Sequence, residues 1–356
     1  MILPLLQLCI LQSVAVAVAV AVAVAGASNN PTLYSMLAAD PGSIKEEESL
    51  LLLSFKASVT GDPLGALETW RNGSSPCTNS WRGITCGADG FVSSVNLTGL
   101  QLSGLFSPNT ISDLRHLTSL DLSNNLFTGP LPPSFCRNIT ILNLFNNSFS
   151  GPIPPALGNS TSLVRISLYS NSLSGSIPPA LGSLHNLEYL ALSFNQLNGS
   201  LPITVLANCT KLTTLALSLN GFSGPLPPQI GRLTNLQNLW LDHNYFSGLI
   251  PAELGNLTRL YLLQLDTNNL TGSIPPSLGQ LTSLTGLLSL SINQLSEYDK
   301  STRVDTKGDF YSVGIVLLEM LTKKRSTNPL FNTMGFNFSM WVSDAYPNRT
   351  FYILDS

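Results

Sequence analysis

One pattern of hydrophobic and polar positions recurs along the chain from residue 92 to residue 296. The pattern is L-x-L-x-x-N-x-L-x-G-x-I-P, and one copy runs from Leu239 to Pro251. Its asparagine returns every 22 to 25 residues, at Asn125, Asn147, Asn171, Asn195, Asn220, Asn244, Asn268 and Asn293. A degenerate first copy has Leu100 at the asparagine position, which makes nine units. Such a period predicts a solenoid, in which each unit buries its apolar residues against its neighbours.

Each recurring position of the pattern has a predicted structural role. The L-x-L segment is typical of a short strand whose leucines point inward, while the residues between them face solvent on a concave side. The asparagine is expected inside the coil, where its amide can pair with backbone groups and form a ladder with its neighbours. Glycine and proline set the path of the chain between strands. The pattern therefore predicts an α/β solenoid, a right-handed leucine-rich-repeat superhelix.

The first residues are typical of a targeting segment. No charge occurs between Ile2 and Ala25, and Ala25-Gly26-Ala27 offers the small residues that a signal peptidase needs. We expect residues 1–27 to be a cleaved secretory signal, followed by a linker over residues 28–43. The apolar stretch is also long enough to span a bilayer, so a retained membrane anchor is the alternative. The product is accordingly expected to be secreted and extracellular, or else held at the plasma membrane.

Residues 44–90 are expected to cap the N-terminal end of the solenoid. Ile44 to Val59 is predicted to be an amphipathic helix that covers the first coil, with Trp70 and Trp81 filling the space behind it. Cys77 and Cys86 lie nine positions apart in a Gly/Ser/Pro-rich loop, which in an exported protein indicates a disulfide. The other cysteines of the mature chain are expected to be small buried hydrophobic residues, and they are Cys136 and Cys209.

Composition narrows the functional classes. The 356 residues are 44% hydrophobic and carry a net charge of −3, which excludes a disordered chain. With 17 Lys+Arg against 20 Asp+Glu there is no basic excess, so nucleic acid is not an expected partner. Three histidines give little support for a His/Cys zinc site, and no metal or cofactor is expected. Charge rises sharply near residue 297, from 23 charged residues in the first 296 to 14 in the last 60.

The repeat and its cap carry a family resemblance. The segments Gly175–Pro178 and Gly272–Pro275 show the G-x-I-P sequence that is similar to the plant-type leucine-rich repeat. Asp62-Pro63, Trp70, Cys77 and Trp81–Cys86 follow in the order of that family's N-terminal cap. The resemblance implies the same capped solenoid over residues 91–296 that the repeat pattern predicts.

The tail, residues 297–356, carries a second resemblance. Lys307 to Thr322 resembles the long central helix of the C-lobe of plant leucine-rich-repeat receptor-like kinases, and Asp309 matches a structural aspartate of that lobe. Glu297 stands where the ninth repeat should have glycine, so the kinase-like sequence begins there. The Gly-rich loop, the phosphate-pairing lysine and both catalytic aspartate motifs are missing, so we expect no phosphoryl transfer. We expect a weakly docked helix over residues 310–322 and an irregular remainder.

The positions between the inward leucines vary from coil to coil and are the candidate ligand-binding residues. Exposed aromatic rings interleaved with a few charges are typical of binding surfaces. The candidates are Phe145, Arg165, Tyr169, Tyr189, Phe194, Trp240, Asp242, His243, Gln264 and Asp266. Asp242-His243 with Asp266 also suggests an acid/base pair, but no serine or cysteine nucleophile is expected beside them and an open concave face admits water. No catalytic residue is therefore predicted.

Glycosylation sequons are frequent. Those within the cap and repeats are at Asn72, Asn96, Asn138, Asn146, Asn159, Asn198, Asn208, Asn256 and Asn269, and two more occur in the tail at Asn337 and Asn348. Asn96 and Asn146 are expected on the strand face, where a glycan would block a ligand. Their occupancy would shift the binding surface toward the later coils.

Three functions remain open from the sequence. The first is a non-catalytic extracellular recognition module that binds a protein or peptide; the resemblance implies cell-surface signalling or defence, with a receptor kinase as a further partner. The second is a secreted inhibitor of cell-wall-degrading hydrolases. The third is that the chain is a fragment of a full membrane receptor serine/threonine kinase. Membrane contact is expected only if the N-terminal apolar segment is retained.

Overall fold

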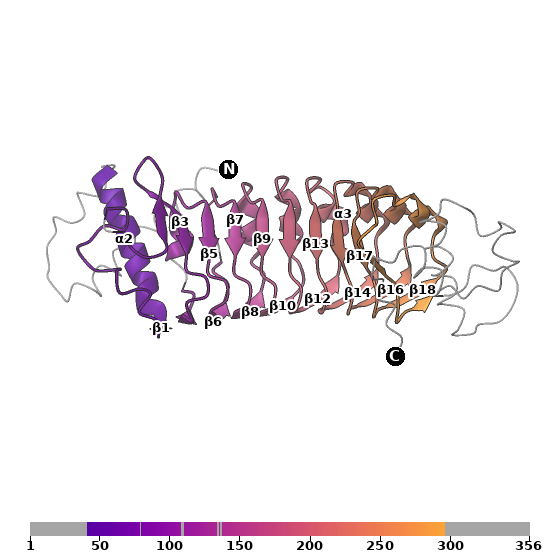
Figure 1. Cartoon of the computed structure of the whole chain (residues 1–356), viewed down its shortest axis with the longest axis horizontal. Helices are drawn as coiled ribbons and strands as arrows, with labels where there is room; N and C mark the ends of the chain where they lie inside the picture. The colour runs from indigo at the N-terminus through magenta and orange to yellow at the C-terminus, as the bar shows by residue number, and fades with distance from the viewer. Residues whose placement is uncertain (1–40, 79, 108–109, 134, 136, 296–356) are drawn as a thin grey trace, which may run out of the picture. The chain divides into compact units, whose positions relative to one another are not determined.

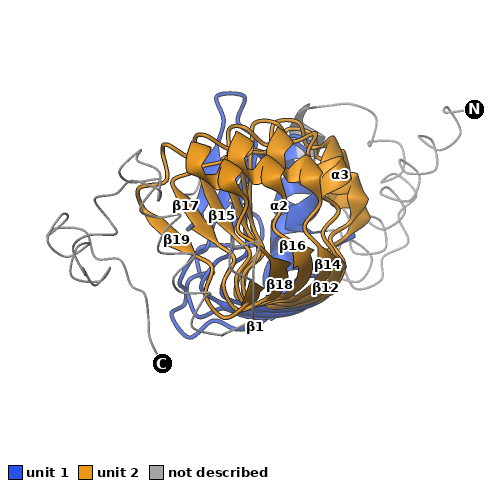
Figure 2. Cartoon of the chain, turned by 90° about the vertical axis from the view of Figure 1, so that its right-hand side faces the viewer, with its two compact units in different colours: residues 1–150 blue, residues 151–356 orange. Residues whose placement is uncertain are grey.

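The computed structural model describes residues 41–295, except residues 79, 108–109, 134 and 136 (Figure 1). The expected signal peptide, most of the linker, Cys136 and the kinase-like tail lie outside the described residues. The chain divides into two compact units, residues 1–150 and residues 151–356 (Figure 2). Within the described ranges, no helix is both long enough and apolar enough to cross a bilayer.

Helix α2 (Pro41–Ser58) forms the N-terminal cap of the first unit. It begins three residues earlier than the predicted helix, and its last residue is also one residue earlier. Leu52 and Phe55 on one face are completely buried. Near its end, the ammonium group of Lys56 donates hydrogen bonds of 2.7 Å to the carbonyls of Leu67 and Trp70, which fixes the loop that follows.

An aromatic cluster fills the space beneath this helix. The ring centroid of Phe55 lies 6.2 Å from that of Trp70 and 5.7 Å from that of Phe127, and Trp70 stacks on Trp81 at 5.5 Å. Both indoles are buried, and both have a hydrogen-bond acceptor: Trp70 Nε1 donates to the carbonyl of Arg82, and Trp81 Nε1 donates to the hydroxyl of Ser74. Large apolar area is thus removed from water without leaving a donor unpaired.

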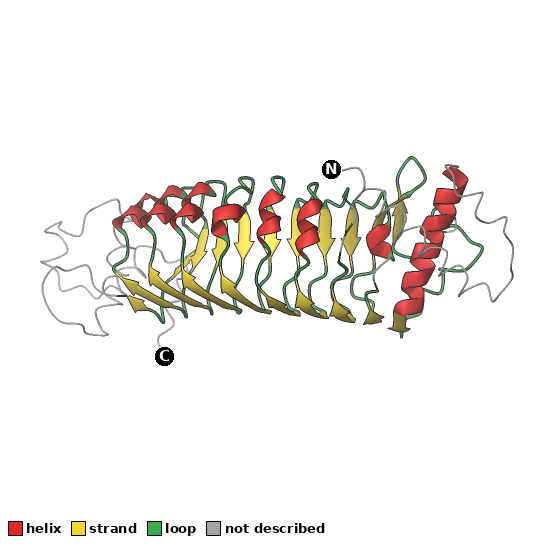
Figure 3. Ribbon diagram, turned by 180° about the vertical axis from the view of Figure 1, so that it is seen from behind, coloured by secondary structure: helices red, strands yellow, loops and turns green. Residues whose placement is uncertain are grey.

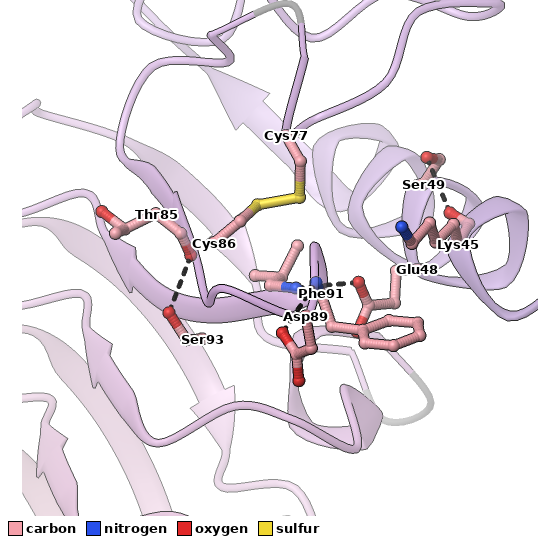
Figure 4. The surroundings of a disulfide bond; sticks show 10 residues. Lys45, Glu48, Ser49, Cys77, Thr85, Cys86, Asp89, Phe91 and Ser93 are labelled. Atoms are coloured by element: carbon pink, nitrogen blue, oxygen red, sulfur yellow. Dashed lines mark hydrogen bonds between the residues drawn. A yellow bond between two sulfur atoms is a disulfide. The ribbon is translucent and has the colours of Figure 1, made fainter. Parts of the chain in front are cut away.

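The cap loop is closed by a disulfide between Cys77 and Cys86, whose Cα atoms lie 5.7 Å apart (Figure 4). Cys86 ends strand β2 (Ile84–Cys86), which pairs antiparallel with strand β3 (Val92–Asn96). The disulfide therefore ties the loop to the edge of the sheet that the repeats continue.

Glu48 joins the helix to the same sheet edge (Figure 4). Its side chain is buried, and its Oε2 accepts a 2.9 Å hydrogen bond from the backbone N–H of Val92. Oε1 is buried and has no hydrogen-bond partner among the described residues. Desolvation outweighs the Val92 hydrogen bond, so the pKa of Glu48 is raised above its ordinary value of 4.5.

Each repeat contributes two short strands. In the first unit, β3 is followed in one parallel sheet by β5 (Ser119–Asp121) and β7 (Ile141–Asn143). The second sheet begins with β1 (Val59–Gly61), antiparallel to β4 (Ser103–Leu105), and continues in parallel with β6 (Leu126–Pro130) and β8 (Ser148–Pro152). A 3-10 turn, η2 (Ile111–Asp113), lies in the connection between β4 and β5.

The second unit repeats the same coil, and its two sheets and the row of helical turns are visible in Figures 2 and 3. One parallel sheet contains β9 (Arg165–Ser167), β11 (Tyr189–Ala191), β13 (Thr214–Ala216), β15 (Asn238–Trp240), β17 (Leu262–Gln264) and β19 (Leu287–Ser289). The other contains β10 (Ser172–Gly175), β12 (Gln196–Ser200), β14 (Gly221–Pro225), β16 (Tyr245–Leu249), β18 (Asn269–Gly272) and β20 (Gln294–Leu295). The helical turns are η3 (Pro155–Asn159), η4 (Pro179–Ser183), α3 (Ile203–Leu206), η5 (Pro228–Arg232), η6 (Ala252–Asn256) and η7 (Pro276–Gln280). The predicted leucine-rich-repeat solenoid is confirmed, whereas the second sheet was not predicted.

The repeated asparagines lie inside the coils and connect each coil to the one before it. Asn244 Nδ2 donates to the carbonyl of Leu217 in the preceding coil at 3.0 Å, and to the carbonyls of Leu241 and Asp242 in its own coil. Its Oδ1 accepts a hydrogen bond from the N–H of Phe222, also in the preceding coil. One side chain therefore satisfies buried donors and acceptors that the short strands leave unpaired.

Replacing Asn244 by alanine is expected to lower the free energy of unfolding by about 2 kcal/mol or more, because a buried N–H and several carbonyls lose their partner. Urea denaturation of the full chain, followed by circular dichroism, measures the change. Asn186→Ala is the matched control, since this exposed amide donates to the Thr161 carbonyl at the surface, and it is expected to change stability by about 0.5 kcal/mol or less. Equal effects for the two variants would contradict the structural role of Asn244.

The stability of the cap is expected to depend on the proton held by Glu48. A raised carboxyl pKa means that the folded state binds this proton more tightly than the unfolded state, so its contribution to stability falls as the pH rises through the folded-state pKa. Glu48→Gln removes the titration and keeps an oxygen acceptor for Val92. Urea denaturation between pH 4 and pH 7.5 should show wild type gaining stability relative to this variant as the pH falls. Glu46→Gln, at an exposed position of the same helix, is the control. If the difference in stability between wild type and Glu48→Gln did not change with pH, the pKa of Glu48 would not be raised.

Candidate ligand-binding surface

The strands of the second unit present rows of side chains on the face opposite the inward leucines. The parallel register aligns Arg165 with Tyr189, and aligns Ala191, Ala216, Trp240 and Gln264 in a second row. A third row follows one inward leucine later, and it consists of Tyr169, Ser193, Ser218, Asp242 and Asp266. Because neighbouring strands lie about 4.8 Å apart, residues of one row on adjacent coils can contact the same ligand.

A hollow of about 380 Å³ opens on this face. Two neighbouring coils contribute small residues to its lining, namely Ala191 and Ser193 from one coil and Ala216 and Ser218 from the next. Larger side chains surround them. They are Tyr169, Tyr189, Phe194, Leu219, Trp240, Asp242 and Gln264. The hollow therefore lies where two coils carry only small residues in rows that place Trp240 next to Ala216 and Tyr169 next to Ser193.

The residue before each asparagine of the ladder has a left-handed backbone, and two of these residues line the hollow. Phe194 has a φ of 57° and Leu219 a φ of 53°. Both side chains are exposed, Phe194 by 55%. His243, Thr267 and Ile292 adopt the same conformation in the following coils. The conformation is unfavourable for residues with a Cβ, and it is imposed here by the turn that brings each asparagine inside.

The edge of the hollow formed by the first coils carries a cation and two phenols. The guanidinium of Arg165 lies over the ring of Tyr189, 3.8 Å from its centroid, in a cation–π contact. Burial raises the pKa of Tyr169 above its ordinary value, and the neighbouring Tyr189 adds to this. Tyr169 is therefore a neutral hydrogen-bonding group at physiological pH.

The opposite edge carries the group Asp242, His243 and Asp266. His243 Nδ1 lies 2.9 Å from Asp242 Oδ2 and 3.9 Å from Asp266 Oδ2, and the Ser218 hydroxyl donates a short hydrogen bond to Asp242 Oδ1. Asp242, His243 and Asp266 each have one possible ligand atom within 4.8 Å of those of the other two. Together they could hold a cation. No serine was predicted beside these residues, and the position of Ser218 shows that this prediction was wrong. The hydrogen bonds run from serine to aspartate to histidine, whereas in a Ser-His-Asp triad the histidine lies in the middle.

Most of the candidate residues come together. Tyr169, Tyr189, Phe194, Trp240, Asp242 and Gln264 line the hollow, Arg165 lies against Tyr189, and His243 and Asp266 lie against Asp242. Phe145 is in the first unit and does not line it. The small residues and Leu219 were missed, although the sequences L-A-L at 190–192 and 215–217 mark the two coils without bulk.

The predicted glycosylation sites lie on the surface of the protein but outside the hollow. All nine sequon asparagines of the cap and repeats have exposed side chains. Asn96 and Asn146, the two expected on the strand face, belong to the first unit, as do Asn72 and Asn138. No residue that lines the hollow is a sequon asparagine. Glycans at these positions would leave the hollow itself unmodified.

Comparison with known families agrees with the fold. Residues 45–87 match the leucine rich repeat N-terminal domain. Leucine-rich-repeat families match residues 116–138, 138–160, 162–184, 208–225, 235–257 and 259–281. These matches lie within the cap and the repeats that the first resemblance indicated.

The curated proteins with similar sequences include plant receptor-like kinases. Pollen receptor-like kinase 3 of Arabidopsis thaliana is 43% identical over 88 residues, which cover 25% of this chain and 14% of that protein. A probably inactive leucine-rich repeat receptor-like protein kinase of the same plant is 50% identical over 93 residues, or 25% of this chain and 10% of the relative. The matched region thus spans less than a sixth of the length of these curated relatives.

Solved structures show the same relationship. The ectodomain of the Arabidopsis thaliana receptor kinase GASSHO1/SCHENGEN3, in complex with CASPARIAN STRIP INTEGRITY FACTOR 2, is similar with a TM-score of 0.67 and 35% identity, over 70% of this chain and 30% of that one. The Arabidopsis HAESA ectodomain, in complex with an IDA peptide hormone, has a TM-score of 0.64 and 36% identity, over 72% and 42% of the two chains. The chain therefore carries a leucine-rich-repeat N-terminal domain and repeats homologous to the ectodomains of plant leucine-rich-repeat receptor-like kinases.

Proposed function

We propose that this chain is a non-catalytic extracellular recognition module that binds an extended protein or peptide segment on the strand face of its second unit. The observation that carries the proposal is the hollow between Tyr169 and Trp240, because it combines apolar volume with aromatic side chains held by the strands. Tyrosine and tryptophan are the residues that most often dominate binding energy, since they bury large area at a small cost in side-chain entropy.

The comparisons support a peptide as the ligand. Both similar ectodomains described above are complexes with a peptide or protein factor, and the HAESA structure with its co-receptor, at a TM-score of 0.57 and 32% identity, has the co-receptor SERK1 bound as well. A co-receptor kinase is accordingly a further proposed partner, and cell-surface signalling or defence the proposed setting. Homologues are extracellular parts of membrane receptors, so the proposed location is outside the cell.

The short match to each curated relative favours a second candidate, in which these repeats belong to a longer receptor kinase. The recognition role of the strand face is the same in both cases. They differ in whether a catalytic domain accompanies it, and sequencing the transcript across codons 290–300 separates them. Intact kinase motifs after the ninth repeat would establish the longer protein and overturn the non-catalytic proposal.

The hollow is tested by removing one wall and by filling its centre. Trp240→Ala is expected to weaken peptide binding by about thirtyfold, in keeping with a central aromatic anchor. Ala216→Trp is expected to block binding altogether, because its side chain would occupy the hollow that Ala216 lines. The probe is a displayed library of random 12-residue peptides, selected on the immobilised full chain, with individual binders then measured by calorimetry.

Tyr245→Ala is the matched control for these variants. Tyr245 is also an exposed aromatic residue of the second unit, but it lies on strand β16 of the other sheet. It should leave binding within about twofold of wild type, which is the size expected for a residue outside the contact. Failure to select any peptide on wild type, or equal binding by Ala216→Trp, would contradict the proposed function.

A further inference from the structure

We propose that the segment bound in the hollow carries a lysine or arginine within two residues of its apolar anchor, and that this cation binds between Asp242 and Asp266. The inference rests on the proposed function and specifies the chemistry of its ligand. It is carried by an imbalance of charge at one edge of the hollow, by the incomplete hydrogen bonding of a carboxylate there, and by the distance between that edge and the other residues that line the hollow.

The edge has more negative charge than its own side chains can neutralise. Asp242 and Asp266 are largely buried, with side-chain exposures of 9% and 13%, and the only cationic partner of either among the described residues is His243. One imidazole carries at most one positive charge, so at least one carboxylate charge remains. Buried charges are normally paired, and a ligand cation would supply the missing partner.

Hydrogen-bonding capacity is also left over at this edge. Asp242 uses Oδ1 for the Ser218 hydroxyl and Oδ2 for His243. Asp266 Oδ1, in contrast, is buried and has no hydrogen-bond partner among residues 41–295 as far as they are described. This shielded oxygen leaves the Asp266 carboxylate incompletely hydrogen-bonded by its own surroundings. A lysine ammonium has three donors and an arginine guanidinium has five, so either could pair with both carboxylates at the small part of each that is exposed.

The distance from the apolar centre fits one short peptide. Asp242 itself lines the hollow, and Asp266 follows in the next coil, where Gln264 pairs with Trp240. One coil corresponds to about 4.8 Å, and an extended peptide advances about 3.3–3.6 Å per residue. A basic residue one or two positions from a side chain in the hollow therefore reaches the carboxylates.

Charge at the opposite edge sets the direction of the bound segment. Arg165 lies over Tyr189 at that end of the hollow, about three coils, or roughly 14 Å, from Asp242. A basic residue of the ligand would be repelled by Arg165 and attracted by the two aspartates. Together they place the basic residue toward the later coils.

A divalent cation is the competing occupant, because the same three side chains have the atoms to bind one. The hydrogen bond between His243 Nδ1 and Asp242 Oδ2 leaves only Nε2 of this imidazole free to bind a metal ion. The neighbouring apolar hollow is not explained by a metal ion, whereas a peptide with an anchor and a basic residue explains both features. The experiment below therefore includes conditions with and without metal.

Random 12-residue peptides displayed in a library are selected on the full-length wild type, on Asp242→Asn/Asp266→Asn, and on Glu253→Gln. Glu253 is an exposed carboxylate of the same unit, on the helical turn η6, and serves as a control for loss of a negative charge away from the hollow. Wild type and Glu253→Gln should select peptides in which lysine or arginine is enriched severalfold within two positions of a large apolar residue. The double variant should select anchored peptides without this enrichment, which also shows that its hollow is intact.

One selected peptide and its Lys→Gln or Arg→Gln counterpart are then compared by calorimetry in EDTA and in 1 mM CaCl₂ or MnCl₂. Loss of the basic residue should weaken binding to wild type by about tenfold and to the double variant by less than about twofold, as a direct charge pair requires. Selection of anchored peptides with no basic enrichment would overturn the inference and leave the proposed function standing. Binding that needs the metal ion would also overturn it, in favour of a cation site. Failure to select any peptide would instead refute the proposed function.

Discussion

The hydrogen bonds of the repeated asparagines are the interaction on which the rest of this structure depends. The strands are mostly three to five residues long, so sheet pairing alone satisfies only part of each coil. Where the chain turns after the first strand, carbonyls of that coil and of the preceding coil point inward. An asparagine side chain combines a donor group and an acceptor at a short reach, and so it can bond to its own coil and to the preceding coil at once. The leucine core packs around a backbone that these side chains have already satisfied.

Much of this architecture could be predicted from the sequence because it is repeated. The leucines and Asn244 recur at fixed spacing, and fixed spacing maps directly onto fixed positions in a coil. The second sheet was missed, since its segments contain glycine and proline and show no long alternation of polar and apolar residues. Those segments form strands because neighbouring coils align them. That is a consequence of stacking, which local sequence does not encode.

The candidate site likewise contains residues that the sequence could identify and residues that it could not. Large and charged residues such as Trp240 and Asp266 stand out when the repeats are compared, and the structure brings most of them together. The hollow itself depends on small side chains, and the importance of Ala216 appears only when its coil is placed between its neighbours. The hydrogen bond from Ser218 to Asp242 and the burial of Glu48 likewise join residues of different coils or elements. Their partners cannot be read from spacing within one repeat.

The left-handed residue before each asparagine places stability and recognition in opposition. Glycine would adopt this backbone without cost, yet these positions hold residues as different as Phe194, His243 and the β-branched Ile292. Each therefore retains a small amount of conformational strain in exchange for a side chain that projects from the strand face. This makes the position the natural place for the array to diversify. A change there alters what the surface presents while the inward leucines and the asparagine remain in place, so new specificities can arise coil by coil without a new fold.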